Sequence, residues 1–566
     1  MPLNAERVYF HQRPEGDKLY FRGRIYDGPA GKSPAEDLAE LLRRPEDLNR
    51  READLAVVGY EARRGRWRLM RDFGATPLYY AQLPGGFAWS FSYSGLLDLL
   101  DDPQPDQGTL FDYLATHYRY IFRDPGRTFH QEVRQVPAGC YLDFDEQGPR
   151  LHSWLDLGPD PETARLGPEE ATEGLMSRLR QSVKLRAAGQ SGRAAFTVSS
   201  GLDSATVASL ASESLGPIDV YSVGYEGPDS REYDETEGVA ELTRGRDWRW
   251  THLRLDCPDL ITETSELIRR GRSPVITVTW LAYYLMTKLM RGYDRLFNGL
   301  GGDESLAGEF GHFFYFFADL KQSGDEARLA GEVAAWSRLH DHPVFKKNPQ
   351  VLARFWERNI DFQTGQMRAD PEMYSGNWRF FNPDWLAAGD PGPPPMPRPY
   401  PDFLSSRLYQ ETTYETTPPT LWGLHMANQV QGLSGVSPFL TPGLFKYCLS
   451  LPGSVKYDQG LTKALLRRGL KGVLPENLRL NPKKTGFNAP IHQWFRESKV
   501  AGPLREMLET GPLARRGWLK KGAAAEIFRE HESGQANHMM LLWSLLNTSL
   551  FLGQSDDRKA PGRSDS

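Results

Sequence analysis

The hexapeptide SSGLDS at residues 199–204 constrains the fold of this chain more than any other segment. An apolar run at 194–198 precedes it, and small, helix-compatible residues at 205–211 follow it. This pattern predicts a strand, a tight polar turn and a helix. Such a turn aims backbone N–H groups and hydroxyls at a point above a helix N-terminus, where a phosphate group is favoured. The segment therefore predicts a site for the phosphates of a nucleotide.

Asp203 places a carboxylate beside this predicted phosphate site, and carboxylate oxygens are ligands that Mg²⁺ prefers. The segment also fits a second interpretation, a capped helix start, because Ser and Asp are common N-caps. A P-loop is excluded: the only Gly-Lys-Ser of the chain stands at 31–33, and Tyr26 occupies the position where that motif needs its first glycine. We interpret that tripeptide as a surface turn.

A second glycine-rich segment supports the phosphate site. An apolar run that ends at Asn298 leads into GLGGDE at 299–304. Three glycines in four residues allow a ligand to approach the backbone closely, and Asp303 adds a carboxylate after a predicted strand. Ligands bind at that edge of open α/β sheets, so Asp203 and Asp303 are expected to share one Mg²⁺. The alternative, a loop with solvated acids, is the better interpretation for either loop alone and the worse one for the pair.

With 566 residues, the chain is long enough for two or more hydrophobic cores. Its 68 basic and 73 acidic residues give a formal net charge of -5, which provides no electrostatic basis for binding nucleic acid or a membrane surface. The cysteines, Cys140, Cys257 and Cys448, are too widely spaced for a disulfide framework or a metal-ligand motif. No stretch is apolar enough to span a bilayer, and the N-terminal segment has no signal core. We therefore expect a soluble cytoplasmic protein.

Hydrophobic patterning divides the chain into two regions. Residues up to about 155 show strand-like alternation, and a Pro-, Gly- and Asp-rich linker follows at 155–167. Beyond it, strands alternate with helices, which predicts a parallel doubly wound sheet. The expected strands are 194–198, 218–223, 250–255 and 294–298. After residue 305 the pattern is mostly helical; the aromatic run 313–317 is interpreted as a buried helix segment, with a substrate wall as the alternative.

The two loops resemble motifs of a known superfamily. SSGLDS resembles the SGGxDS pyrophosphatase loop of ATP-dependent amidotransferases, and NGLGGDES resembles their second glycine–aspartate loop. Further segments follow in the order typical of the asparagine synthetase superfamily. They are YSVGY at 221–225 with acids at 234–235, VSPFL at 436–440, TKALLR at 462–467, and PKKTGF at 482–487 followed by Pro490, Ile491 and Trp494. By that spacing, Lys484 takes the place of the superfamily's essential lysine.

The resemblance, which runs from about residue 60 to about residue 550, implies two domains. RDFG at 71–74, PLYY at 77–80 and VPAG at 136–139 are similar to segments of the superfamily's glutaminase domain. The implied fold is α/β. It combines a degenerate glutaminase-like, Ntn-hydrolase-type β-rich sandwich with an ATP-pyrophosphatase domain that has a doubly wound parallel sheet and large helical additions. The expected bounds are 1–155 for the first, 168–553 for the second and 554–566 for a frayed polar tail.

Three departures from the superfamily pattern bear on function. Glutamine-using members begin the mature chain with a cysteine nucleophile, whereas this chain begins Met1-Pro2-Leu3 and its cysteines are internal, so the glutaminase is expected to be inactive. Asparagine synthetases carry Gly-Glu-Gly where this chain has Gly299-Leu300-Gly301, which puts aspartate recognition and ammonia handling in question. Thr441 stands where the superfamily has an aspartate after VPFL.

The resemblance implies that ATP is cut between its α- and β-phosphates to place AMP on a carboxylate, which a held amine then attacks. Mg²⁺ on Asp203 and Asp303 would neutralise the pyrophosphate. Lys484 would stabilise the α-phosphate and the oxyanion of amide formation; the alternative is that Lys483 and Lys484 are surface cations. The expected catalytic residues are Lys484, Asp203 and Asp303. The expected ATP-binding residues are Val198, Ser199, Ser200, Gly201, Asp203, Ser204, Val223, Gly301, Gly302 and Lys484.

Without a terminal cysteine, the amine is expected to come from the substrate itself. Superfamily members with this lesion close rings: lasso peptide cyclases join a peptide's N-terminal amine to an Asp or Glu side chain, and β-lactam synthetases close a small ring with a tyrosine–glutamate pair. Tyr414 and Glu415 are the candidates for such a pair, but adjacent side chains do not face one another. This favours the peptide cyclase, as does an aromatic-rich helical region that would enclose a folded peptide.

The resemblance therefore implies a macrolactam synthetase that uses ATP and Mg²⁺ on a peptide substrate, the core of a leader-processed precursor. Whether a leader-binding protein and a protease act as further partners stays open. The alternatives are an ammonia-dependent asparagine synthetase, a β-lactam synthetase-like cyclase and, in a different class, a catalytically silent binding scaffold. Intact Asp203, Asp303 and Lys484 argue against the scaffold.

Overall fold

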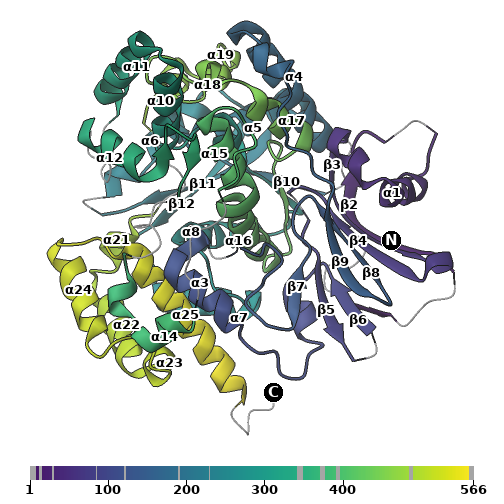
Figure 1. Ribbon diagram of the computed structural model, residues 1–566, viewed down its shortest axis with the longest axis vertical. Coiled ribbons are helices and arrows are strands. Elements are labelled where there is room, and N and C mark those ends of the chain that lie inside the picture. Colours follow the sequence, from purple (N-terminus) through teal and green to yellow (C-terminus); the bar gives the residue numbers. More distant parts are fainter. Residues whose placement is uncertain are drawn as a thin grey trace.

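The computed structural model describes residues 8–11, 16–28, 31–74, 76–84, 86–119, 121, 123–188, 192–227, 230–340, 349–369, 376–389, 396–483 and 489–559. Figure 1 shows the N-terminal strands on one side of the molecule, a second sheet at its centre, and the helices of the C-terminal half around that sheet. The division into a β-rich region and a mixed region agrees with the hydrophobic patterning.

Two antiparallel sheets form the N-terminal region. One sheet has the strand order β2 (Lys18–Ile25), β3 (Ala53–Glu61), β4 (Arg66–Arg71), β8 (Cys140–Asp145) and β9 (Gly148–Ser153). The other has the order β1 (Val8–His11), β6 (Gly86–Ser90), β5 (Tyr79–Leu83) and β7 (Val133–Gln135). Alternate residues of both sheets, among them Trp67 and Trp89, form one buried core between them. The predicted sandwich is confirmed.

A parallel five-stranded sheet lies at the centre of the second region. Its strand order is β12 (Trp248–Leu255), β11 (Ile218–Tyr225), β10 (Ala194–Thr197), β13 (Arg295–Phe297) and β16 (Ser434–Val436). Every neighbouring pair is parallel. The four predicted strands are confirmed, and β16 is an addition. The strand order reverses between β10 and β13, so the ligand crevice of such a sheet is expected between these two strands.

Helices cover both faces of this sheet, which explains why its strands read as nearly continuous apolar runs. Phe196 and Val220 face one core, and their neighbours Ala195 and Tyr221 face the other. The first core includes α4 (Pro168–Ala187), α5 (Leu202–Leu215) and α17 (Pro442–Ser450). The second includes α7 (Leu260–Gly271), α8 (Val278–Thr287) and α16 (Thr417–Gln429). The doubly wound arrangement is therefore confirmed.

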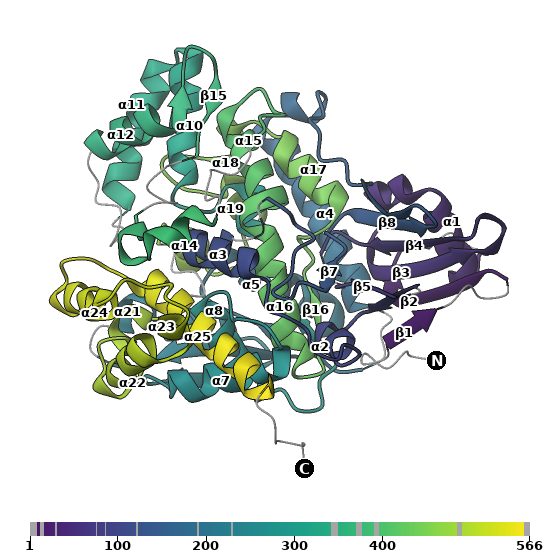
Figure 2. The same ribbon diagram turned by 60° about the horizontal axis from the view of Figure 1, so that its bottom comes forward.

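The sandwich and the central sheet are packed into one body. Arg186 of α4 is fully buried, and its Nη2 donates to Asp54 Oδ1 of β3 at 2.8 Å. In helix α3 (Gln107–Thr116), the Tyr113 hydroxyl donates to the Val275 carbonyl at 3.2 Å. Figure 2 shows α16 near the middle of the molecule, with the N-terminal strands to one side. Residues from both regions can therefore line one cavity.

The chain after residue 305 is largely helical, as predicted. The aromatic run 313–317 lies in α10 (His312–Ser323), and all five rings are buried in a core, which confirms the buried-helix interpretation. Helix α25 (Met539–Lys559) continues through residues 554–559, so the prediction that a frayed tail begins at 554 is wrong for that part; residues 560–566 lie outside the described residues. Over the described ranges, none of the helices has the length and apolarity needed to cross a bilayer.

Candidate active site

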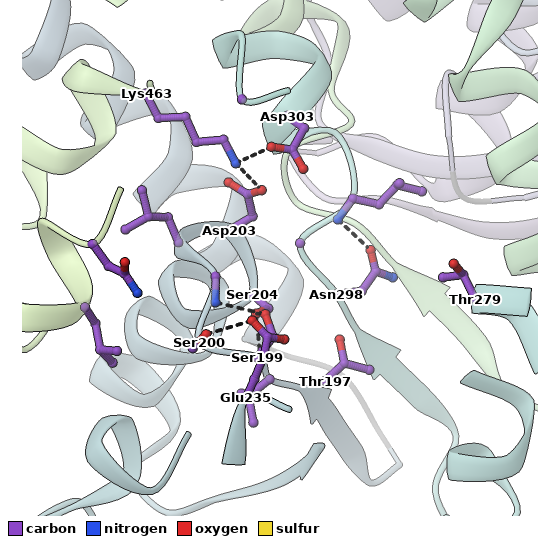
Figure 3. Close-up of a pocket in the computed structure, with 18 of the residues that line it drawn as sticks. Thr197, Ser199, Ser200, Asp203, Ser204, Glu235, Thr279, Asn298, Asp303 and Lys463 are labelled. Atoms are coloured by element: carbon purple, nitrogen blue, oxygen red, sulfur yellow. Dashed lines mark hydrogen bonds and ion pairs between the residues drawn. The ribbon is translucent and has the colours of Figure 1, made fainter. Parts of the chain in front are cut away.

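The two predicted loops meet at the carboxyl ends of β10 and β13, where the strand order reverses. A cavity of about 270 Å³ opens between them. The residues of the first loop that line it are Val198, Ser199, Ser200, Gly201, Leu202, Asp203 and Ser204. The second loop contributes Asn298, Gly299, Leu300 and Asp303. Figure 3 shows labelled side chains from both loops around this cavity, among them Asp203, Asn298 and Asp303.

Hydroxyl groups fix the conformation of the first loop. Ser204 Oγ accepts a hydrogen bond from the Ser199 backbone N–H at 3.0 Å, and the two hydroxyls are 2.9 Å apart. Ser200 Oγ donates to Glu235 Oε1 at 2.7 Å. Gly201, the N-cap of α5, supplies no side chain to cap the helix. The first turn of α5 therefore keeps N–H donors for an anion, which disfavours the interpretation of the segment as a self-capped helix start.

Lys463 joins the two predicted metal ligands. Its Nζ lies 2.5 Å from Asp203 Oδ2 and 2.6 Å from Asp303 Oδ1 (Figure 3). Lys463 is buried and precedes α19 (Ala464–Gly469) with a left-handed backbone, φ 54°, a conformation that is uncommon outside glycine and clusters at functional sites. TKALLR stands out in the sequence as a family-like segment, but no spacing rule places its lysine between the two acids.

The glycines of the second loop have a different role from the one predicted. A Cβ at Gly302 would collide with the Asp203 carboxylate, so this glycine lets the two loops touch. Gly301 has φ 96° and packs against Leu440. Neither residue lines the cavity. The glycines thus bring Asp303 next to Asp203, and we correct the expectation that all three allow a ligand to approach the backbone.

The two carboxylates fit a divalent cation. Oxygens of Asp203 and Asp303 already converge on one cationic atom, the Lys463 Nζ. Hard carboxylate oxygens are the ligands that Mg²⁺ prefers. Over the described residues, no cluster of three or more His, Cys, Asp or Glu side chains is placed to hold a metal alone. A Mg²⁺ here would need ligands from a substrate, as nucleotide sites provide.

The far wall of the cavity comes from α8, α16 and the second loop. It consists of Thr279, Trp280, Tyr283, Leu300, Thr420 and Leu424. Among the described residues, the acids that line the cavity are Asp203, Asp303 and Glu235, and all three belong to the phosphate-loop end. The wall is therefore mixed hydroxyl, aromatic and aliphatic, and it offers no carboxylate to a substrate.

Several other predicted or suggested residues lie elsewhere. Val223 points into the core on the α8 side of the sheet and does not line the cavity. Lys484 falls in 484–488, outside the described residues, whereas its neighbour Lys483 lines the cavity. Further cavity residues that were not predicted as site residues are Thr197, Thr279, Trp280, Tyr283, Thr420, Thr462, Arg467 and Asn481, although Thr462 and Arg467 belong to the family-like segment TKALLR. Burial lowers the pKa of Arg467 to about 10, although Asp203 acts in the opposite sense.

Tyr414 and Glu415 do not form a catalytic pair. Both lie in the π-helical turn η7 (Glu411–Glu415), and neither lines the cavity. The Glu415 carboxylate accepts two hydrogen bonds from Arg407, each 2.8 Å long. The Tyr414 ring instead packs against Tyr409. The expectation that adjacent side chains diverge is confirmed.

None of the three cysteines has the environment of a nucleophile. Burial raises the pKa of Cys140 to about 11, of Cys257 to about 11 and of Cys448 to about 12. A nucleophilic thiol needs a lowered pKa, because the thiolate is the reactive form. The three thiols are therefore inert at neutral pH.

Comparison with known proteins agrees with this geometry. The sequence matches the Asparagine synthase family over residues 174–553 and a Glutamine amidotransferase domain over residues 44–155. The first match covers the central sheet, both loops and α16. The second covers most strands of the sandwich. The predicted pairing of a glutamine amidotransferase-type domain with an asparagine synthase domain is confirmed.

Individual relatives share only a low percentage of identical residues with this chain. The chain is 24% identical, over 84% of its length and 72% of the relative's, to a putative glutamine-hydrolyzing asparagine synthetase of Mycobacterium tuberculosis, and equally to that of Mycobacterium bovis. It is 28% identical to a glutamine-hydrolyzing asparagine synthetase of Bacillus subtilis, over 19% of this chain and 17% of that protein. A solved glutamine phosphoribosylpyrophosphate amidotransferase from B. subtilis covers 39% of this chain and 47% of its own, with 13% identity and a TM-score of 0.18.

Proposed function

The chain belongs to the asparagine synthase family of ATP-dependent, AMP-forming amide ligases, and from this membership we propose that it closes a macrolactam ring in a peptide. The proposed substrate carries an Asp or Glu side chain as the carboxylate and its own N-terminal amine as the nucleophile. The observation that carries the proposal is the far wall of the cavity, which holds apolar Leu300 and no acid among its described residues.

ATP is the co-substrate of the proposed reaction, and the first loop binds its phosphates. The N–H groups at the start of α5 and the hydroxyls of Ser199 and Ser204 face the anion. Asp203 and Asp303 would hold Mg²⁺, whose chemistry is to neutralise charge on the leaving pyrophosphate. Lys463 holds this pair of carboxylates together. Lys484 is proposed to stabilise the oxyanion that forms when the amine attacks the activated carbonyl.

The substrate is proposed to supply the amine, because none of the chain's thiols is suited to take one from glutamine. All three thiols have raised pKa values, so none of them attacks a glutamine amide. An N-terminal α-amine has an ordinary pKa of about 7.7–8.0 and needs little activation. The β-lactam synthetase-like alternative is disfavoured, since the Glu415 carboxylate is bound to Arg407.

The test follows a linear peptide with a free N-terminal glycine and an acid several residues on. A short reading frame beside the gene that encodes a leader and such a core would supply the sequence, with its leader-binding protein and protease as proposed partners. With ATP and Mg²⁺, mass spectrometry should show loss of one water from the peptide and release of AMP. An N-acetylated peptide, the matched control, should stay linear. Failure of the free-amine peptide to cyclise would contradict the proposal.

Ammonia-dependent asparagine synthesis is the second candidate, because the relatives are named asparagine synthetases. The same enzyme preparation is therefore incubated with aspartate, ammonium chloride and ATP. Formation of asparagine at a rate above that of cyclisation would favour this candidate. Glutamate release from glutamine above a no-enzyme control would refute the inactive glutaminase that both candidates assume.

A further inference from the structure

A second cavity of about 270 Å³ lies at the opposite edge of the central sheet, between that sheet and the sandwich. Arg295 begins β13, whereas Asn298, which lines the first cavity, follows the end of the same strand. The two cavities are therefore separated by roughly 10 Å along β13. The second cavity is lined by Arg22, Gly23, Arg24, Tyr26, Asp54, Thr76, Pro77, Arg295, His425, Asn428, Gln429, Leu433, Ser434, Gly435 and Val436.

Two arginines of this cavity bury N–H donors for which the described part of the chain provides no acceptor. Arg22 Nη1 and Arg295 Nε are inaccessible to solvent and have no hydrogen-bond partner among the described residues. Asn428 Nδ2, on α16, is a third such donor on the same cavity. A buried donor without an acceptor costs about 1–3 kcal/mol, more for a charged group, so groups of this kind indicate a missing acceptor.

The one acid that lines the cavity is already bound elsewhere, as far as the described residues show. Asp54 accepts hydrogen bonds from Arg186 Nη2 at 2.8 Å and from the Tyr26 hydroxyl at 2.9 Å. Asp54 therefore does not neutralise the positive charge of Arg22. Burial is the largest cause of the lowered pKa of both Arg22 and Arg295; for Arg295 the charge of Arg24 also lowers the pKa, whereas Asp294 acts in the opposite sense.

We propose that this cavity binds a small oxyanion, a phosphate or a carboxylate group, held by Arg22 and Arg295 with Asn428 as a neutral donor. Guanidinium groups suit both anions, because their planar fork matches carboxylate and phosphate oxygens. This site is independent of the proposed ring closure.

The site also adjoins the first cavity through one hydrogen bond. The Tyr283 hydroxyl donates to Asn428 Oδ1 at 3.2 Å, and Tyr283 lines the first cavity. An anion on Asn428 Nδ2 would thus contact a residue that is hydrogen-bonded to Tyr283 in the wall of the first cavity.

The test measures binding of inorganic phosphate and of succinate by calorimetry and by thermal unfolding, with potassium chloride at equal ionic strength as baseline. At least one of the two anions should bind, and Arg22→Gln should weaken it by tenfold or more. Arg295→Gln should do the same. Arg63→Gln, a substitution on the exposed surface, should leave the affinity unchanged. Binding of phosphate alone assigns a phosphate ligand, and binding of succinate alone assigns a carboxylate.

Two further measurements keep the result interpretable. Anions also fit the first loop, so Ser204→Ala serves as a control variant for the first cavity and should leave anion binding at the second cavity intact. Loss of anion binding in Ser204→Ala but not in Arg22→Gln would place the anion at the first cavity and overturn the proposal. Arg295 also donates to the Arg186 carbonyl at 3.0 Å, so its variant is checked by circular dichroism. The Nη1 group of Arg22 has no partner among the described residues, so Arg22→Gln alone carries the test if Arg295→Gln does not fold. Absence of binding for both anions would also refute the site.

Discussion

Two clusters in this molecule have the same arrangement of charges and different surroundings. In each, one cation bridges two carboxylates. Lys463 bridges Asp203 and Asp303 beside the first cavity. Arg407 bridges Glu411 and Glu415 in the core near η7, with Arg407 Nε 2.9 Å from Glu411 Oε1.

In the second cluster, which we call the closed cluster, every charged group has a partner within the protein. Arg119 lies 3.3 Å from Glu415, and His312 Nε2 makes a 2.7 Å hydrogen bond to Glu411. These contacts and a bidentate guanidinium fix every member, and none of them lines the first cavity. The Asp203–Lys463–Asp303 cluster has a single point charge between its acids and faces that cavity. Burial of an ion pair thus does not mark a functional site, whereas an ion cluster that faces a cavity is a candidate for one.

The largest effect on activity is expected at Asp203 and Asp303, for which the comparison predicts a functional role and no structural one. Asp203→Asn and Asp303→Asn should each lower AMP formation on the order of 10³-fold or more, because each removes a ligand of the proposed Mg²⁺. The loss of stability should be smaller than that caused by removing the bridging cation of the other cluster, since Lys463 keeps one carboxylate partner. AMP release and urea unfolding measure the two effects. Asp458→Asn, a change at an exposed acid, is the control; near-normal turnover in both site variants would show that the shared site is wrong.

Breaking the closed cluster should have the opposite outcome. Arg407→Met leaves two buried carboxylates without their main counter-charge and should cost about 3–5 kcal/mol of unfolding free energy, measured with urea. Arg505→Gln removes an exposed pair with Glu532 and should cost less than about 1 kcal/mol. A loss for Arg407→Met no larger than that of the control would show that the two clusters do not differ in this way.

Lys484, which follows the cavity residue Lys483 in the sequence, sharpens the comparison on the catalytic side. Lys484→Ala should slow ring closure by a factor on the order of 10²–10³, the effect of losing one oxyanion donor. Lys484→Arg should not rescue it, because a planar fork does not replace a compact point charge. Lys483→Ala, the neighbouring control, should lose far less. Equal damage from both alanine variants would shift the assignment by one residue, and no damage from either would remove this lysine from the mechanism.

Acid should weaken the closed cluster through Glu411. Although burial acts to raise it, the charges of His312 and Arg407 hold the pKa of Glu411 down at about 2. A carboxyl with a depressed native pKa stabilises the fold above its unfolded pKa of about 4.3, and this contribution is lost as pH falls toward 2. The loss is on the order of 2–3 kcal/mol. Urea midpoints at pH 5, 4 and 3 (about these values) should fall less steeply for Glu411→Gln than for the wild type; parallel curves would contradict the assignment.

Much of the fold could be predicted because its signals are local. Apolar runs at 194–198 and 294–298 identify buried strands, and the loops after them place Asp203 and Asp303 at one edge of the sheet. Strand β16 escaped prediction because Ser434–Val436 is three residues long and begins with Ser and Gly. The end of α25 was missed because polar residues can extend a helix that is already packed.

The rest of the site depends on contacts between distant segments. Lys463 reaches both acids only because α19 packs on α4 and starts with a left-handed residue. Tyr283 and Asn428 meet because α8 packs on α16. Hydrophobic periodicity carries information on which face of a helix is buried, and none on which polar group of another element lies opposite. For the same reason, the arginines of the second cavity were not predicted.

The central claim is that the Asp203–Lys463–Asp303 cluster serves an AMP-forming reaction, and pyrophosphate exchange tests it directly. The protein is incubated with ATP, Mg²⁺, labelled pyrophosphate and the linear N-acetylated peptide, whose acid can be adenylated but whose amine cannot close the ring. Label should enter ATP only when the peptide is present, and Asp203→Asn should abolish the exchange. ADP as the main product, or exchange that persists undiminished in Asp203→Asn, would contradict the account.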